Sequence, residues 1–305
     1  SLLRPRINAR LDEALMLPAC TLCAPAGFGK SVAVSQWCAS LDRPAVWLSL
    51  DRSVDDPHWF VLHLVAAVRE VYPEAFPVVA HMAKGAESPS AEALILELSN
   101  EFEELPGPIV VVFDDFHLLT SPECVEIVSA LLRHPPEFVH FVIVSRHEPP
   151  PALGKLGAMG RLVEVRSGEL AFTAPEVDTL TRQELGRALA PDVADELFRS
   201  TEGWPAGVRL AIEGLRYAAD DDILVGPGLL DQAAQEYLVT EVLDRVPAEV
   251  RQHLLVVSMF DQFNGELCDA LAGVMPDEQP MAGTDFIGWM RRNGMFVVAL
   301  DPEGE

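Results

Sequence analysis

The stretch Ala24-Pro25-Ala26-Gly27-Phe28-Gly29-Lys30-Ser31 decides the fold of this chain. Its last three fixed positions match the phosphate-binding pattern G-x-x-x-x-G-K-[ST], and Ala24 stands in place of the first glycine. A short apolar run at 18–23 predicts a buried strand before the loop, and residues 31–41, which contain no glycine or proline, predict a helix after it. A phosphate site requires this context, because the first N–H groups of the helix are unpaired.

The glycines and the lysine of this loop predict how it binds phosphate. Gly27 and Gly29 let successive N–H groups converge on a β-phosphate without Cβ clashes. Lys30 can bridge the β- and γ-phosphates, and the Ser31 hydroxyl can hold Mg²⁺. The residues expected to bind nucleotide here are Ala26, Gly27, Phe28, Gly29, Lys30, Ser31 and Val32. A glycine-rich turn with an incidental lysine is the alternative interpretation of the loop taken alone.

A second motif is an aspartate pair after an apolar run. Residues 109–113 read Ile-Val-Val-Val-Phe and are followed by Asp114 and Asp115, which places two carboxylates at the carboxyl end of a buried strand. Ligands bind at that edge in open α/β sheets. We expect Asp114 to orient Mg²⁺ through its water shell and Asp115 to polarise an attacking water. An aspartate pair that only caps the following turn is the alternative.

A third apolar run, at 138–144, delivers Ser145 and Arg146 to the same edge. Arg146 could reach the γ-phosphate with a bidentate fork and so distinguish ATP from ADP. The alternative is a solvated arginine at the end of a strand. With Lys30 and Asp115, Arg146 completes the predicted catalytic group.

The rest of the first half alternates strands and helices. Strands are predicted at 45–50 and 161–165, and helices at 57–71, 90–105 and 122–132. Such alternation predicts an α/β fold, a parallel sheet with helices on both faces.

After residue 170 the sequence becomes mainly helical. Thr173 and Glu176 form a predicted capping box, so a helix should begin there. Charge and chain breakers at 218–228 predict a linker. Other predictions are helices at 192–199, 205–217, 231–245 and 248–257, a further helix pair, and a strand at 295–300, after which we expect the last domain to be incomplete.

Composition narrows the function. With 22 Lys and Arg against 47 Asp and Glu, the formal net charge is −25, which opposes direct binding of nucleic acid. No apolar run is long enough to span a membrane, and no signal sequence is evident, so a cytoplasmic location is expected. Five scattered cysteines predict free thiols, and no metal site is expected beyond Mg²⁺ carried by the nucleotide.

Further short motifs accompany the loop along the chain. In order they are Arg4-Pro5-Arg6, the loop, Trp47-Leu48-Ser49-Leu50-Asp51, Phe113-Asp114-Asp115-Phe116-His117, Val144-Ser145-Arg146, Leu170-Ala171-Phe172-Thr173 and Gly203-Trp204-Pro205-Ala206. This ordered set resembles the amino-terminal ATPase part of the large LuxR-type transcriptional activators of the maltose-activator (MalT) kind, within the STAND class of signalling NTPases. An alanine at the first loop position is ordinary in that family.

The resemblance implies a P-loop nucleotide-binding domain over 1–170, a small helical domain over 171–228 and a winged-helix domain over 229–305. The Gly-x-Pro element of the family matches Gly203-Trp204-Pro205, which implies that Pro205 packs on the adenine. It also points to Arg4, Arg6 and Ile7 as lining the adenine. In related proteins an inducer-binding sensor and a DNA-binding helix-turn-helix lie in other domains, which this chain does not contain.

These features favour a regulatory switch that binds ATP or ADP with Mg²⁺, hydrolyses ATP slowly as a weak ATPase, and self-associates in the ATP form. A metabolic phosphotransferase is less well supported, because the acidic helical region after Thr173 offers no cationic lid. An AAA-like ring ATPase, which would need an arginine supplied in trans, and a scaffold that binds no nucleotide also stay open on the sequence.

Overall fold

The computed structural model describes residues 2–84, 89–148, 151–217, 246–260, 263–272 and 281–292. These residues belong to two compact units. One comprises the described residues of Leu3–Ala24 and Gly29–Leu170, and the other joins Leu2 and Pro25–Phe28 to the described residues from Ala171 onward. The predicted linker at 218–228, helix at 231–245 and strand at 295–300 lie outside the described residues.

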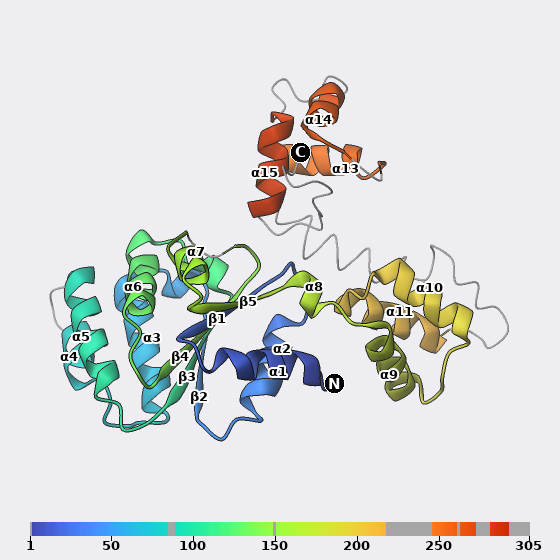
Figure 1. Ribbon diagram of the computed structural model, residues 1–305. Coiled ribbons are helices and arrows are strands. Elements are labelled where there is room, and N and C mark those ends of the chain that lie inside the picture. The colour runs from blue at the N-terminus through green and yellow to red at the C-terminus, as the bar shows by residue number, and fades with distance from the viewer. Residues whose placement is uncertain are drawn as a thin grey trace. The chain divides into compact units, whose positions relative to one another are not determined.

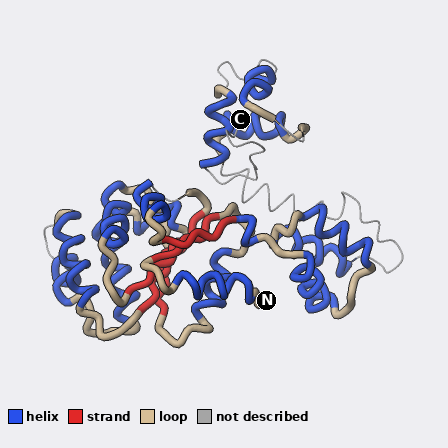
Figure 2. The backbone as a smooth tube through the Cα atoms, in the orientation of Figure 1, coloured by secondary structure: helices blue, strands red, loops and turns tan. Residues whose placement is uncertain are grey.

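The first unit is built on a parallel sheet of five strands in the order β2-β3-β4-β1-β5 (Figures 1 and 2). The strands are β1 (Ala19–Cys23), β2 (Ala45–Ser49), β3 (Ile109–Asp114), β4 (Val139–Ser145) and β5 (Leu162–Arg166). Every residue of β3 and β4 is buried, as expected for central strands covered on both faces. The prediction of a parallel α/β sheet is confirmed.

Helices cover both faces of this sheet, α1 and α2 on one face and α3, α5 and α6 on the other (Figure 1). The helices of the unit are α1 (Pro5–Ala14), α2 (Lys30–Cys38), α3 (Pro57–Arg69), α4 (Pro77–Lys84), α5 (Ala91–Glu103), α6 (Pro122–Arg133), α7 (Pro151–Ala158) and α8 (Ser167–Leu170). The sequence did not predict α1, α4, α7 and α8. The last three are short, and the polar residues of α1 hide its buried side chains.

Aromatic side chains fill the space between the sheet and the helices α3 and α5. Phe113 of β3 and Phe141 of β4 stack with ring centroids 6.0 Å apart and planes inclined by 9°. Phe60 stacks on Phe113 from α3, and Phe102 meets Phe141 edge-on from α5. Offset and edge-on aromatic pairs add about 0.5–1.5 kcal/mol beyond the area that they bury. This packing supports the parallel pairing of β3 with β4, and because the two strands are parallel, both end at the same edge of the sheet.

The described residues of the second unit form two helical groups, each with its own core. One group comprises α9 (Ala174–Leu185), α10 (Pro191–Thr201) and α11 (Pro205–Tyr217), whose core includes Phe172, Leu180 and Val208. The other comprises α13 (Ala248–Val257), α14 (Gly265–Ala272) and α15 (Gly283–Arg292), packed around Phe286.

The start of α9 is as predicted from the sequence. The Thr173 N–H donates to the Glu176 carboxylate at 2.8 Å, and the Glu176 N–H donates back to the Thr173 hydroxyl at 3.4 Å. This capping box satisfies donors that the first turn leaves unpaired. The predicted helices at 192–199 and 205–217 are also present, as α10 and α11.

Candidate functional site

The phosphate loop bends through two glycines. Gly27 has φ +77° and Gly29 has φ +72°, a region that side chains with a Cβ rarely adopt. Ala24 is not among the described non-glycine residues with positive φ, and its N–H donates to the Ser145 carbonyl at 3.3 Å in line with the β1–β4 ladder. The first position of the loop therefore continues the strand, which explains why alanine serves there as well as glycine.

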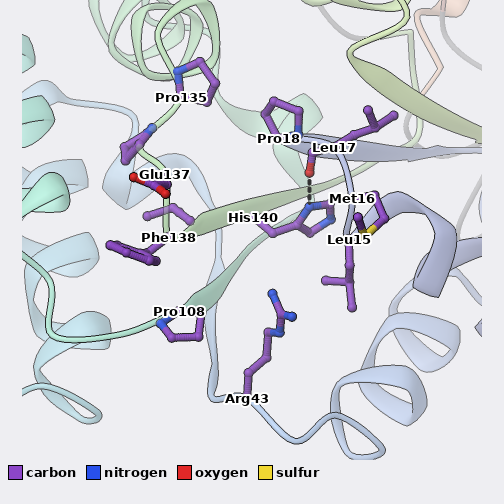
Figure 3. Close-up of a pocket in the computed structure, with 12 residues that line it drawn as sticks. Leu15, Met16, Leu17, Pro18, Arg43, Pro108, Pro135, Glu137, Phe138 and His140 are labelled. Carbon is purple, nitrogen blue, oxygen red and sulfur yellow. Dashed lines mark hydrogen bonds between the residues drawn. The ribbon is translucent and has the colours of Figure 1, made fainter.

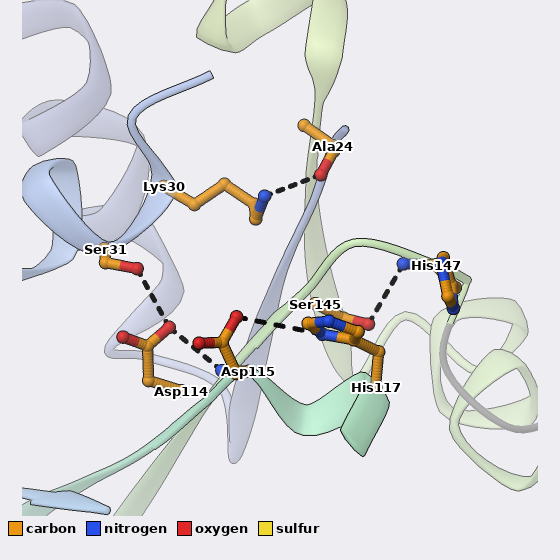
Figure 4. A network of polar contacts seen from close by, with 8 residues as sticks. All are labelled: Ala24, Lys30, Ser31, Asp114, Asp115, His117, Ser145 and His147. Atoms are coloured by element: carbon orange, nitrogen blue, oxygen red, sulfur yellow. Dashed lines mark hydrogen bonds and ion pairs between the residues drawn. The ribbon is translucent and has the colours of Figure 1, made fainter. Parts of the chain in front are cut away.

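Lys30, the first residue of α2, is held against the loop. The residue is 8% exposed, and its ammonium donates to the Ala24 carbonyl at 2.6 Å (Figure 4). Burial, and after it the nearby charge of Arg146, lowers the pKa of Lys30 to about 8. The two cations thus lie close enough to repel each other, and an anion between them would relieve that repulsion.

The Ser31 hydroxyl donates to the Asp114 carboxylate at 2.9 Å, and so links α2 to the end of β3 (Figure 4). The same Asp114 oxygen accepts the Asp115 N–H at 3.0 Å. Burial, and to a lesser extent the charge of Asp115, raises the pKa of Asp114, whereas the Ser31 hydroxyl lowers it. A hydroxyl beside a buried carboxylate is the kind of oxygen pair that Mg²⁺ takes up, so the residues present fit that ion.

Space and backbone at the loop also fit a phosphate. A Cβ built on Gly29 would meet no atom within 4 Å, so there is open space beside the backbone at this residue. The residue directly follows Phe28 and precedes the first turn of α2, where helical N–H groups lack helical partners.

Asp115 follows Asp114 with a left-handed backbone, φ +54°, at the start of a short 3₁₀ turn over Phe116–Leu118. Its side chain is 47% exposed, so a water molecule can reach the carboxylate, and one oxygen lies 3.8 Å from Nδ1 of His117 (Figure 4). The rings of His117 and His147 meet edge-on at 5.2 Å. Sequence reasoning assigned these histidines no role, although each lies within three residues of a predicted site residue.

The other predicted nucleotide contacts are distributed as follows. Val32 is 52% exposed on α2, Ile7 is 1% exposed within α1, and Arg4 is 5% exposed just before it. Arg6 donates to the Glu169 carbonyl at 2.6 Å. The roles of Arg4, Arg6 and Ile7 in binding adenine, and of Val32 in binding nucleotide, stay predictions.

Pro205 is the buried first residue of α11 and belongs to the unit that also holds the loop tip, Pro25–Phe28. Its neighbour Trp204 donates from Nε1 to the Ala26 carbonyl at 3.1 Å, and the Ala206 N–H donates to the Gly27 carbonyl at 3.0 Å. The contact of Pro205 with adenine stays a prediction. The sequence drew attention to the proline and gave no sign of what Trp204 does.

A hollow of about 350 Å³ lies at the amino ends of the strands, and its lining includes Arg43, Phe138 and His140 (Figure 3). Nδ1 of His140 lies 2.8 Å from the Leu17 carbonyl and must donate to it, because a carbonyl only accepts. Burial lowers the pKa of His140 to about 4, so the ring is neutral near pH 7.

Within the described residues, no group of three or more His, Cys, Asp and Glu side chains could hold a metal ion. No described helix is long and apolar enough to cross a membrane.

Comparison with known sequences gives two kinds of match. A family model described as the MalT winged helix domain matches residues 239–305, which confirms the predicted winged helix. The chain is 29% identical over 308 residues to the HTH-type transcriptional regulator MalT of Cronobacter sakazakii, an alignment that covers 100% of this chain and 33% of that protein. The chain is 28% identical over 311 residues to the MalT of Vibrio parahaemolyticus, an alignment that covers 99% of this chain and 33% of that protein. The chain thus spans about a third of the length of these relatives.

Solved structures share the fold. A Walker-type ATPase of Pyrococcus abyssi superposes with a TM-score of 0.68 at 15% sequence identity, and the alignment covers 98% of this chain and 91% of the ATPase chain. A STAND protein with a tetratricopeptide repeat sensor, from Pyrococcus horikoshii, gives a TM-score of 0.53 at 16% identity, over 95% of this chain and 38% of its own.

Proposed function

We propose that this chain, a MalT-like P-loop NTPase of the STAND class, is the ATP- and ADP-binding switch module of a LuxR-type transcription regulator. The observation that carries the proposal is the meeting of Ser31 with Asp114 at 2.9 Å, beside the buried Lys30. Three groups from two elements 83 residues apart in sequence thereby converge at the carboxyl edge of a parallel sheet, where nucleotides bind in such folds.

Each residue has a distinct part in this proposal. The loop N–H groups and Lys30 bind the phosphate chain, and Ser31 and Asp114 hold Mg²⁺, which when bound neutralises phosphate charge. Arg146 reaches the γ-phosphate and so distinguishes ATP from ADP. Asp115 holds the attacking water, and its partly exposed carboxylate leaves room for one. Pro205, Arg4, Arg6 and Ile7 line the adenine.

The switch follows from differential affinity. A nucleotide shifts a conformational balance only by binding one state more tightly, so the γ-phosphate must make contacts that ADP lacks. We assign those contacts to Arg146 and Mg²⁺. ATP then favours a form that self-associates, and slow hydrolysis returns it to the ADP form.

The proposed organisation is a nucleotide-binding domain at 1–170, a helical domain at 171–228 and a winged-helix domain at 229–305. Binding of the inducer and of promoter DNA is assigned to regions of the regulator outside this chain, in keeping with a net charge of −25. A regulator of this kind works beside bacterial DNA, so we place it in the cytoplasm.

Calorimetry with ADP and ATP tests the proposal. Lys30→Ala removes a charge-assisted contact worth about 1.5–3 kcal/mol, so both affinities should fall at least about tenfold. Lys155→Ala, which removes an exposed lysine on α7, is the matched control and should leave both unchanged. Equal binding by the native protein and Lys30→Ala would refute the assignment of the loop.

Two further measurements address the switch. Nucleotide retained by the purified protein can be released by denaturation and identified by ion exchange, which shows the resting state. Light scattering with ADP and with a non-hydrolysable ATP analogue tests self-association, and equal mass in both would contradict an ATP-promoted assembly.

A further inference from the structure

The tip of the phosphate loop is hydrogen-bonded to the start of α11. The indole N–H of Trp204 donates to the Ala26 carbonyl at 3.1 Å, and the backbone N–H of Ala206 donates to the Gly27 carbonyl at 3.0 Å. Two consecutive carbonyls of the loop are therefore held by donors that lie 178 and 179 residues further along the chain. All of these residues belong to one compact unit.

These two hydrogen bonds fix the orientation of two peptide planes. In a trans peptide the C=O and the following N–H point in opposite directions, and no described peptide bond is cis. Because the Ala26 carbonyl points at the indole, the Gly27 N–H points away from it. The Gly27 carbonyl points at α11, so the Phe28 N–H likewise points away. Those N–H groups are among the donors with which a loop of this pattern binds phosphate.

The indole of Trp204 packs against two glycines. A Cβ on Gly27 would lie 2.7 Å from Nε1 of Trp204, and a Cβ on Gly207 would lie 2.6 Å from Cε3. Both glycines are thus in contact with the ring, one from the loop and one from α11.

The backbone that carries the ring is anchored too. Gly203 has φ +72°, and a Cβ there would lie 2.2 Å from the Phe172 carbonyl oxygen. Its own carbonyl accepts the Phe172 N–H at 2.7 Å. Only glycine allows this close approach of two backbone segments. The approach fixes the backbone next to Trp204 and so sets the direction of its side chain.

We infer that Trp204 is a positioning residue for phosphate binding: through the Ala26 carbonyl it orients the loop N–H groups before a nucleotide arrives. The inference rests on the proposed function and adds a residue to it. It assigns Trp204 to the phosphates, in contrast to the contact with adenine proposed for its neighbour Pro205. A donor that is oriented in advance costs less entropy on binding, so losing Trp204 should weaken phosphate binding itself.

The test compares Trp204→Phe with the native protein. Phenylalanine keeps an aromatic ring between the two glycines and removes the N–H donor. Trp59→Phe, at a tryptophan of α3 that is 52% exposed, is the matched control. Affinities for ADP with Mg²⁺ are measured by calorimetry, and those for inorganic pyrophosphate by displacement of a fluorescent ADP analogue. Thermal denaturation checks folding, and Trp204→Leu repeats the measurement should the phenylalanine variant not melt cooperatively.

We expect Trp204→Phe to bind ADP and pyrophosphate about 2- to 10-fold more weakly, by the same factor for both, as the loss of one neutral hydrogen bond predicts. Unchanged ADP affinity would overturn the inference. So would weaker binding of ADP alone, because that places Trp204 at the base or sugar. Lys30→Ala run in parallel separates the two levels: ADP binding that is independent of both residues refutes the proposed function, whereas binding that depends on Lys30 and not on Trp204 refutes only this inference.

Discussion

Lys30 should take up a proton when nucleotide binds. Burial and the charge of Arg146 lower its pKa to about 8 in the free protein. Phosphate oxygens next to the ammonium favour its charged form and raise the pKa, so the bound lysine is fully protonated near neutral pH. At pH 8 half of the free molecules carry a neutral Lys30, so binding should take up about 0.5 proton per nucleotide, falling to about 0.1 at pH 7.

Calorimetric titration with Mg²⁺ and ADP in buffers that differ in ionisation enthalpy measures this number, as the slope of observed enthalpy against buffer enthalpy. ADP avoids heat from hydrolysis, and its phosphates are fully ionised at pH 8. Lys30→Arg is the control, because a guanidinium stays charged throughout and the slope should fall close to zero. A slope near zero for the native protein at pH 8, or one equal to that of Lys30→Arg, would refute the placement of Lys30 in a buried cationic site.

Three other predictions concern single positions. Asp115→Asn should slow ATP hydrolysis, measured by phosphate release, about 100-fold or more, and should leave the ADP affinity measured by calorimetry unchanged. A loss of affinity equal to that of Lys30→Ala would show that the role of Asp115 is wrongly assigned. Gly27→Ala should destabilise the protein by at least about 1 kcal/mol more than Gly29→Ala, because both have positive φ but only Gly27 has atoms at 2.7 Å from the added Cβ; equal denaturation midpoints would contradict this. The pKa of His140, about 4 when folded, lies below its unfolded value, so its contribution to stability is present above about pH 6.5 and is lost as the pH falls toward 4. As the pH falls from neutral toward 4, the free energy of unfolding measured with urea should decrease by about 2–3 kcal/mol more for the native protein than for His140→Gln.

The sequence predicted the sheet well because its signals are local. The apolar runs at 109–113 and 138–144 have no polar face to place in water, and both became central strands buried on each side. The capping box at Thr173 is likewise a short-range pattern and set the start of α9. The helix at Pro5–Ala14 was missed, since its many polar residues mask the helical spacing of Ile7 and Leu11.

The candidate site was predictable in its composition but not in its connections. The loop pattern and the aspartate pair lie on elements whose ends the parallel sheet brings together, so the approach of Ser31 to Asp114 could be expected. No local pattern relates Trp204 to Ala26, because the hydrogen bond spans 178 residues and depends on how the loop tip packs. The left-handed backbone of Asp115 was equally hidden, since aspartate adopts it only when the surroundings require it.

The packing around the indole also has an evolutionary consequence. Side chains at positions 27 and 207 would both run into the ring at 204, so these three positions are sterically one unit. A substitution at 207 is tolerable only after the ring has become smaller, which makes the order of the changes matter. Among homologues, a smaller residue at 204 should therefore accompany any residue other than glycine at 207, and lineages that keep the tryptophan should keep both glycines.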